Sequence, residues 1–114
     1  MSELEVRREQ PADGVIVVAL VGELDLSTAE EVDSELASAE LEDPRVLALD
    51  LQGTTFLDST GLRTVIRADE ERRRKGRRLA VLPGPENVKR IFSLTGLDEQ
   101  LWMVADRGDL LTTS

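Results

Sequence analysis

The stretch that decides the fold is Val15-Ile16-Val17-Val18-Ala19-Leu20-Val21, a continuous apolar run rich in β-branched residues. A half-buried strand would alternate apolar and polar residues, so this run predicts a strand that is buried on both faces. Residues 46–51 and 79–82 are two further runs of similar character. We expect these three segments to form the interior of a sheet that is covered by helices.

Segments with helical spacing lie between and after these runs. The first predicted helix begins at Ser27, where Glu30 completes a capping box, and it ends before Pro44. The second helix follows Asp58, and the third has Pro85 in its first turn. The apolar residues expected to face the sheet are Ala29, Val32, Leu36 and Ala39, then Leu62, Val65 and Ile66, then Val88, Ile91 and Phe92.

The two ends of the chain complete the expected architecture. Residues 4–7 alternate apolar and polar, and the Asp13-Gly14 pair after them favours a hairpin, which makes this first strand antiparallel. Residues 101–104 are typical of a short last strand, and a short helix is expected after them. The predicted fold class is therefore α/β. We expect a single domain over residues 1–114, with a mixed, mostly parallel sheet of about five strands covered by about four helices.

The composition excludes several kinds of functional site. The chain has 114 residues, no cysteine and no histidine, and a formal net charge of −9. Disulfides, thiolate metal sites and the commonest general base are thereby excluded, and we expect a protein without cofactor or metal that is not an enzyme. The negative charge repels nucleic acid and anionic membrane surfaces, so a basic protein surface is the favoured partner. The acidic N-terminus lacks the layout of a signal peptide, and the expected location is the cytoplasm.

Two segments at predicted strand ends carry the polar residues of interest. They are Gly22-Glu23-Leu24-Asp25, expected as a loop, and Phe56-Leu57-Asp58-Ser59-Thr60-Gly61, expected after a bend at residues 52–55. Because the carboxyl ends of neighbouring parallel strands meet at one edge of a sheet, we expect both segments at the same rim. Ser59 falls at or just before the first turn of a helix, where free N–H groups favour an anion such as a phosphate. The same Asp-Ser-Thr pattern is also typical of a plain helix N-cap.

The stretch Phe56-Leu57-Asp58-Ser59-Thr60-Gly61-Leu62 closely resembles the signature of bacterial anti-sigma factor antagonists, which are single STAS-domain proteins. Residues 22–29 resemble the loop by which that family enters its first helix, and residues 88–97 resemble its third helix and following turn. The three motifs stand in the expected order, and the resemblance covers residues 4–111. One departure is Arg63, where many members carry a second glycine. It adds a long cation beside the site and bears on the choice of partner.

The resemblance implies a regulator that is switched by phosphorylation. The acceptor in this family is the serine directly after the aspartate, which is Ser59 here rather than Thr60. The unphosphorylated form would bind an anti-sigma factor that is also a serine kinase and thereby release a sigma factor. Phosphorylation would separate the two proteins, and a PP2C-type phosphatase would restore the hydroxyl. The expected partner surface around the acceptor consists of Glu23, Asp25, Asp58, Thr60, Gly61, Arg63 and Arg67.

Other interpretations stay open on the sequence. A STAS domain can also serve as a scaffold or adaptor in another signalling or transport complex, or as a module that binds a small ligand such as a nucleotide or lipid. A serine hydrolase is disfavoured, because the chain has no histidine and no Gly-x-Ser-x-Gly motif. The basic run at residues 72–78 is expected to be a solvated helix end. Arg107-Gly108-Asp109 is expected to form a turn and a helix cap.

Overall fold

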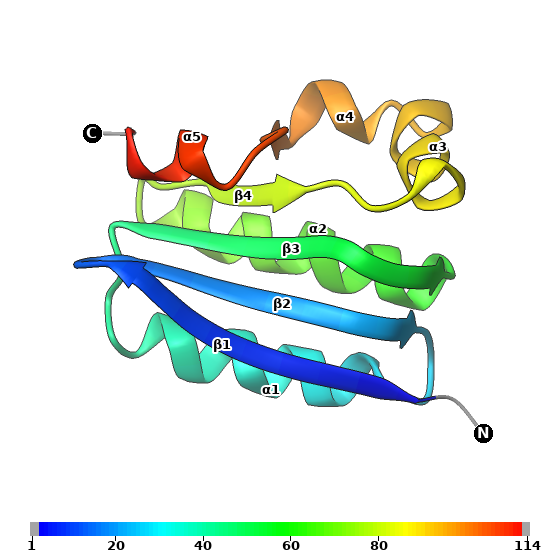
Figure 1. Cartoon of the computed structure of the whole chain (residues 1–114), viewed down its shortest axis with the longest axis horizontal. Coiled ribbons are helices and arrows are strands. Elements are labelled where there is room, and N and C mark those ends of the chain that lie inside the picture. Colours follow the sequence, from blue (N-terminus) through cyan, green and yellow to red (C-terminus); the bar gives the residue numbers. More distant parts are fainter. Residues whose placement is uncertain (1–2, 113–114) are drawn as a thin grey trace.

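The computed structural model describes residues 3–112, and these form a five-stranded sheet with five helices around it (Figure 1). The strands lie side by side in the order in which they occur along the chain. They are β1 Leu4–Ala12, β2 Val15–Leu24, β3 Val46–Leu57, β4 Leu79–Leu82 and β5 Trp102–Met103. The helices are α1 Ala29–Glu40, α2 Ser59–Arg74, α3 Glu86–Leu94, α4 Leu97–Gln100 and α5 Gly108–Leu111.

The pairing of the strands confirms the mixed sheet that the sequence predicts. β1 runs antiparallel to β2 through the turn at Asp13-Gly14, where Gly14 has a φ of 74°, a value that glycine adopts without a steric penalty. The pairs β2–β3, β3–β4 and β4–β5 are all parallel. The three apolar runs therefore occupy the interior of the sheet, as expected.

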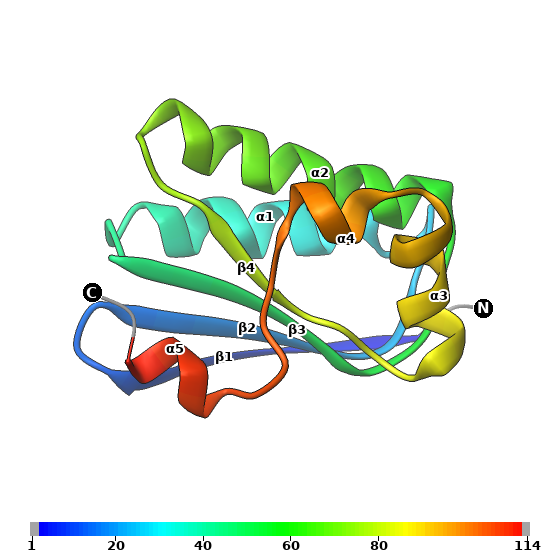
Figure 2. The same ribbon diagram turned by 90° about the horizontal axis from the view of Figure 1, so that it is seen from above.

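Helices α1 and α2 lie side by side over one face of the sheet, and α5 lies against the other face (Figure 2). A large core fills the space under α1 and α2, and a smaller core lies on the face of α5. The predicted core residues that are fully buried are Val18, Leu49, Val65, Val81 and Phe92. Ile66 and Ile91 are only half-buried, but they pack against the large core.

The expected loops at the ends of β2 and β3 are wrong in extent. Residues 22–24 and 52–57 continue as strand, with Gly22 opposite Thr54, Glu23 opposite Phe56 and Leu24 opposite Leu57. Glycine, threonine and acidic residues are typical of turns, yet here the parallel ladder continues through two register shifts and pairs their backbone groups. Both strands thus reach the rim from which α1 and α2 begin.

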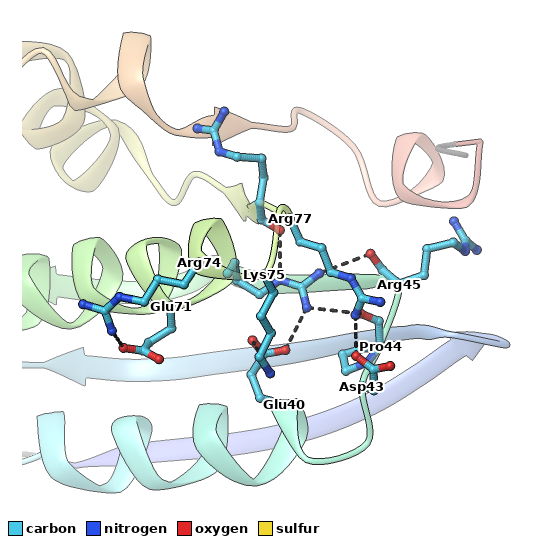
Figure 3. A network of polar contacts seen from close by, with 10 residues as sticks. Glu40, Asp43, Pro44, Arg45, Glu71, Arg74, Lys75 and Arg77 are labelled. Atoms are coloured by element: carbon cyan, nitrogen blue, oxygen red, sulfur yellow. Dashed lines mark hydrogen bonds and ion pairs between the residues drawn. The ribbon is translucent and has the colours of Figure 1, made fainter.

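The end of α2 also departs from expectation, because Arg72 is buried rather than solvated. Its side chain is 1% exposed and lies 2.7 Å from a carboxylate oxygen of Glu40. Its remaining donors bind the backbone oxygens of Pro44, Arg45 and Arg78 at 3.1, 3.2 and 3.1 Å. These contacts join the ends of α1 and α2 to the segments that lead into β3 and β4. Figure 3 shows Glu40, Pro44 and Arg45 gathered at this place, where Arg77 also binds Asp43. The other basic side chains of the run are far more exposed, as predicted for all of them.

On the opposite sheet face, Arg107 joins β1 to β3. Its guanidinium binds the two carboxylate oxygens of Glu9 at 2.7 and 3.0 Å and Oδ2 of Asp50 at 2.8 and 3.0 Å. The hydrogen bond from Arg107 lowers the pKa of Glu9, and the bond to Glu9 raises the pKa of Arg107. Arg107 occupies the N-cap position of α5 without a side-chain capping bond, Gly108 and Asp109 lie in the helix, and Asp106 Oδ1 accepts a hydrogen bond of 2.6 Å from the N–H of Gly108.

One helix was not expected at all. The single turn α4 follows Gly96, whose φ of 75° marks the end of α3. Gly96 therefore closes one helix and opens the next, while the sequence predicts only the closure. Four residues are too few to show a helical period, which explains why α4 escaped prediction.

Candidate functional site

The two polar segments meet at one rim of the sheet, as the parallel topology requires. Residues 23 and 24 of β2 pair with residues 56 and 57 of β3, so the loops that follow both strands start side by side. A shallow, open recess between these loops is lined by Asp25, Leu26, Ser27, Phe56 and Asp58. The structure thus brings Asp25 and Asp58 together next to the first turn of α2.

Ser59 is the first residue of α2, and it is exposed. The N-cap of this helix is Asp58, whose Oδ1 accepts a hydrogen bond of 2.9 Å from the N–H of Gly61. The capping interpretation of the Asp-Ser-Thr pattern therefore applies to Asp58, and the Ser59 hydroxyl is not needed to close the helix end. A phosphate on Ser59 would stand at the positive end of a sixteen-residue helix dipole, which favours a negative charge.

Gly61 holds the start of α2 against the sheet. A Cβ atom on this residue would lie 2.5 Å from the backbone oxygen of Leu24 and 2.7 Å from Cδ1 of Leu57. Only glycine allows this close approach. The glycine of the motif is buried, and its evident role is to set the position of Asp58 and Ser59 relative to β2 and β3.

Asp25 organises the loop between β2 and α1. Its Oδ1 accepts hydrogen bonds from the N–H and the hydroxyl of Ser27 at 2.9 and 2.7 Å. Thr28 Oγ1 accepts a bond of 3.0 Å from the N–H of Asp25 and donates one of 2.8 Å to the oxygen of Glu23. The expected helix start at Ser27 is wrong, because α1 begins at Ala29 and the side chains of Ser27 and Thr28 bind the loop instead of capping the helix.

The remaining predicted site residues are spread along α2 and the rim. Glu23 and Thr60 are half-buried, and Arg63 is exposed on the first turns of α2. Arg67 is exposed and lies 3.9 Å from Asp33 of α1, so it faces the neighbouring helix more than the rim. The structure brings Glu23, Asp25, Asp58 and Thr60 to the rim, while Arg67 lies two turns away from Ser59.

Two apolar residues of the rim were missed by the sequence analysis. Leu26 and Phe56 are large, exposed and part of the lining of the recess. The signal was present, since Leu26 is the one apolar residue between Asp25 and Ser27 in a polar loop. An apolar residue in a polar loop can equally turn inward to the core, so only the exposure seen in the structure places Leu26 and Phe56 at the rim.

The part of the chain that the structure describes offers neither a metal centre nor a membrane span. Among residues 3–112 no three acidic side chains are placed to hold a metal ion. No helix in the same range has both the length and the apolar character needed to cross a bilayer. What the rim offers is an exposed hydroxyl beside two carboxylates and two apolar side chains.

Comparison of this chain with known proteins identifies the class to which its fold and rim belong. The chain belongs to the STAS domain family, whose family model matches residues 8–110. It is 29% identical over 100 residues to the anti-sigma-F factor antagonist RsfB of Mycobacterium tuberculosis, a match that covers 88% of this chain and 81% of RsfB. The resemblance to anti-sigma factor antagonists found in the sequence is thereby confirmed.

Solved structures share this fold. The crystal structure of an anti-sigma factor antagonist from Mycobacterium paratuberculosis matches with a TM-score of 0.84 at 29% identity, covering 96% of this chain and 92% of that one. SpoIIAA, a cell fate determinant of Bacillus, shares the fold at lower identity. Its unphosphorylated form matches with a TM-score of 0.79 at 22% identity, covering 94% of this chain and 93% of that one. Its phosphorylated form matches with a TM-score of 0.73 at 21% identity, covering 94% and 96%.

Proposed function

We propose that this protein is an anti-sigma factor antagonist whose unphosphorylated form binds an anti-sigma factor with serine kinase activity and so releases a sigma factor. The observation that carries the proposal is the position of Ser59, exposed at the start of α2 directly after the capping Asp58. The similarity to RsfB and to the mycobacterial structure supports the same role. In this role the chain is a cytoplasmic regulator rather than an enzyme.

Phosphorylation of Ser59 is the proposed off-switch. A phosphate adds a charge of about −1.5 to −2 at neutral pH, and here it would join Asp25 and Asp58 at the same rim. The fold itself would tolerate the group, because Ser59 is exposed and the helix dipole favours an anion there. A bound partner would have to accommodate the phosphate or remove its hydration shell. Phosphorylation would therefore lower the stability of the complex rather than that of the free chain. A PP2C-type phosphatase would reverse the switch.

The proposed partner surface extends from the rim onto α2. Glu23, Asp25, Asp58 and Thr60 would contribute at the rim, and Arg63 and Arg67 would contribute along the exposed side of the helix. Gly61 would contribute indirectly, because its close packing against the sheet fixes the position of the helix start. A basic kinase surface matches this arrangement, since the chain carries a net charge of −9.

The experiment is the incubation of the purified protein with a cognate anti-sigma factor kinase and ATP, followed by intact mass measurement and peptide mapping. We expect a gain of about 80 Da that maps to Ser59. Ser59→Ala should abolish the gain and keep partner binding, whereas Thr60→Val should be modified at close to the wild-type rate. A phosphate on Thr60, or none after stable complex formation, would refute Ser59 as the switch. Absence of any complex would favour the alternative of a scaffold or ligand-binding STAS domain.

A further inference from the structure

Large apolar side chains that reach the surface are few in the described part of the chain, and two of them share one place. The exposed ones are Val21, Leu26, Leu41, Phe56, Leu94 and Leu111. Of these, Leu26 and Phe56 line the recess at the rim together with Asp25 and Asp58. They come from the loop after β2 and from the end of β3, which are far apart in sequence.

Leu26 is displayed by a loop that is held in place. Its side chain is 78% exposed, although burial of leucine is normally favourable. The hydrogen bonds of Asp25 with Ser27, and of Thr28 with the backbone of residues 23 and 25, fix the loop on both sides of it. A side chain held in this way loses little backbone freedom on binding, which favours its use as a contact.

The backbone around Phe56 is also held in place by hydrogen bonds. It is 46% exposed and pairs through its backbone with Glu23. The residue before it, Thr55, donates its hydroxyl to the oxygen of Gly22 at 3.3 Å and accepts a bond of 3.0 Å from the Asn87 side chain of α3. Aromatic side chains with few rotatable bonds are over-represented among residues that dominate interface energies.

We propose that Leu26 and Phe56 form the apolar centre of the docking surface for the anti-sigma factor kinase, an inference that rests on the function proposed above. The complementary partner surface is an apolar recess bordered by basic side chains. The apolar recess would receive Leu26 and Phe56, and the basic border would face the carboxylates of Asp25 and Asp58. Charge complementarity supports this occupant, because the rim is acidic and the whole chain is strongly negative.

This arrangement also gives the switch a physical reason. Ser59 directly follows Asp58, which lines the same recess, so a phosphate on its hydroxyl would stand at the edge of the apolar contact. A phosphate placed in an apolar interface next to carboxylates is disfavoured by desolvation and by like-charge repulsion. The apolar pair supplies the affinity, and the phosphate removes it.

The test is calorimetric titration of the kinase into wild type, Leu26→Ser, Phe56→Ser and the matched control Leu41→Ser. Leu41 is 88% exposed and follows the other end of α1, about 18 Å along the helix from the loop of Leu26. We expect Leu26→Ser and Phe56→Ser each to weaken binding about tenfold or more, and Leu41→Ser to bind as wild type does. Melting temperatures should stay close to wild type for the two leucine variants.

The outcomes separate this inference from the function on which it rests. Wild-type affinity in Leu26→Ser and Phe56→Ser, with the wild-type chain bound and phosphorylated at Ser59, would overturn the apolar docking centre and leave the function intact. An equal loss in Leu41→Ser would also overturn it, because the effect would then not be local. If the wild-type chain neither binds nor is modified by anti-sigma factor kinases, the proposed function fails and the inference fails with it. Leu26→Ser decides the matter should Phe56→Ser fold poorly, since Leu26 lies in an exposed loop.

Discussion

Helix α2 begins and ends in two contrasting environments. At its end, the buried Arg72 binds Glu40 and three backbone oxygens from other segments. At its start, Ser59 is exposed, and the side chains of Asp25 and Asp58 accept hydrogen bonds from residues of their own segments, Ser27 and Gly61. We therefore expect the polar contacts at the end of α2 to contribute more to stability than those around Ser59, so that a change of charge at Ser59 leaves the fold intact.

The largest expected effect is at the buried end. Arg72→Met should lower the free energy of unfolding by about 3 kcal/mol, because it leaves the Glu40 carboxylate without its main partner. The exposed neighbour Arg74 provides the control, and Arg74→Met should change stability by less than about 0.5 kcal/mol. Urea unfolding of both variants measures the difference. Equal stability in the two variants would show that the Arg72 network is not a main source of stability.

Gly61→Ala should give the next largest effect and is the one strong stability effect expected at the rim. The new Cβ would meet the oxygen of Leu24 at 2.5 Å, so the start of α2 must shift at a cost of about 1–3 kcal/mol. Ser59→Ala, two residues earlier, meets no such obstacle and should leave the unfolding midpoint nearly unchanged. Thermal melts of the two variants decide this, and a neutral Gly61→Ala would contradict the close packing.

Two substitutions at Asp58 distinguish the contribution of the capping hydrogen bond from that of the negative charge. Asp58→Ala removes the acceptor for the N–H of Gly61 and should cost about 1 kcal/mol of stability. Asp58→Asn keeps an acceptor of similar capping strength and should cost much less, while it removes one negative charge from the rim. Chemical denaturation compares the stabilities. An equal loss in both variants would show that the charge, rather than the hydrogen bond, stabilises the helix start.

The smallest effect is expected at Glu9, on the sheet face away from α1 and α2. Arg107 lowers the pKa of Glu9, so its contribution to stability is present above its ordinary pKa of 4.5 and is lost as the pH falls through the lowered value. Glu9→Gln should therefore be less stable than wild type at neutral pH, and the gap should narrow below pH 4.5. The gap is small because Glu9 is partly solvated. Urea midpoints across a pH series test this, and a gap that widens in acid would contradict it.

The parts of the fold that could be predicted from the sequence are those in which the order of apolar and polar residues indicates the type of element. The continuous, β-branched apolar run at residues 15–21 predicts an interior strand, and β2 lies there. The sequence pattern predicts the wrong structure where contacts between distant segments override the local preference of the residues. Residues 22–24 and 52–57 were expected outside the strands, yet the ladder continues through them, with Gly22 opposite Thr54, Glu23 opposite Phe56 and Leu24 opposite Leu57.

Burial of a charged residue is equally invisible to local reasoning. Arg72 lies within a run of charged residues, and nothing in that run marks it as different from Arg73 or Arg74. Its partners, Glu40 and three backbone oxygens, reach it only when the chain has folded. At the candidate site, the acidic residues and Ser59 were found from their position after strands. Leu26 and Phe56 were missed because their importance comes from exposure, which a sequence does not state.

The central claim is that the charge on Ser59 controls binding at the rim. The most direct test is the dissociation constant of an anti-sigma factor kinase for the unphosphorylated chain and for the chain fully phosphorylated at Ser59, measured by calorimetry under the same salt conditions. We expect phosphorylation to weaken binding by about a hundredfold or more, which corresponds to about 3 kcal/mol, with the melting temperature of the free chain little changed. Equal affinity of the two forms would contradict the account.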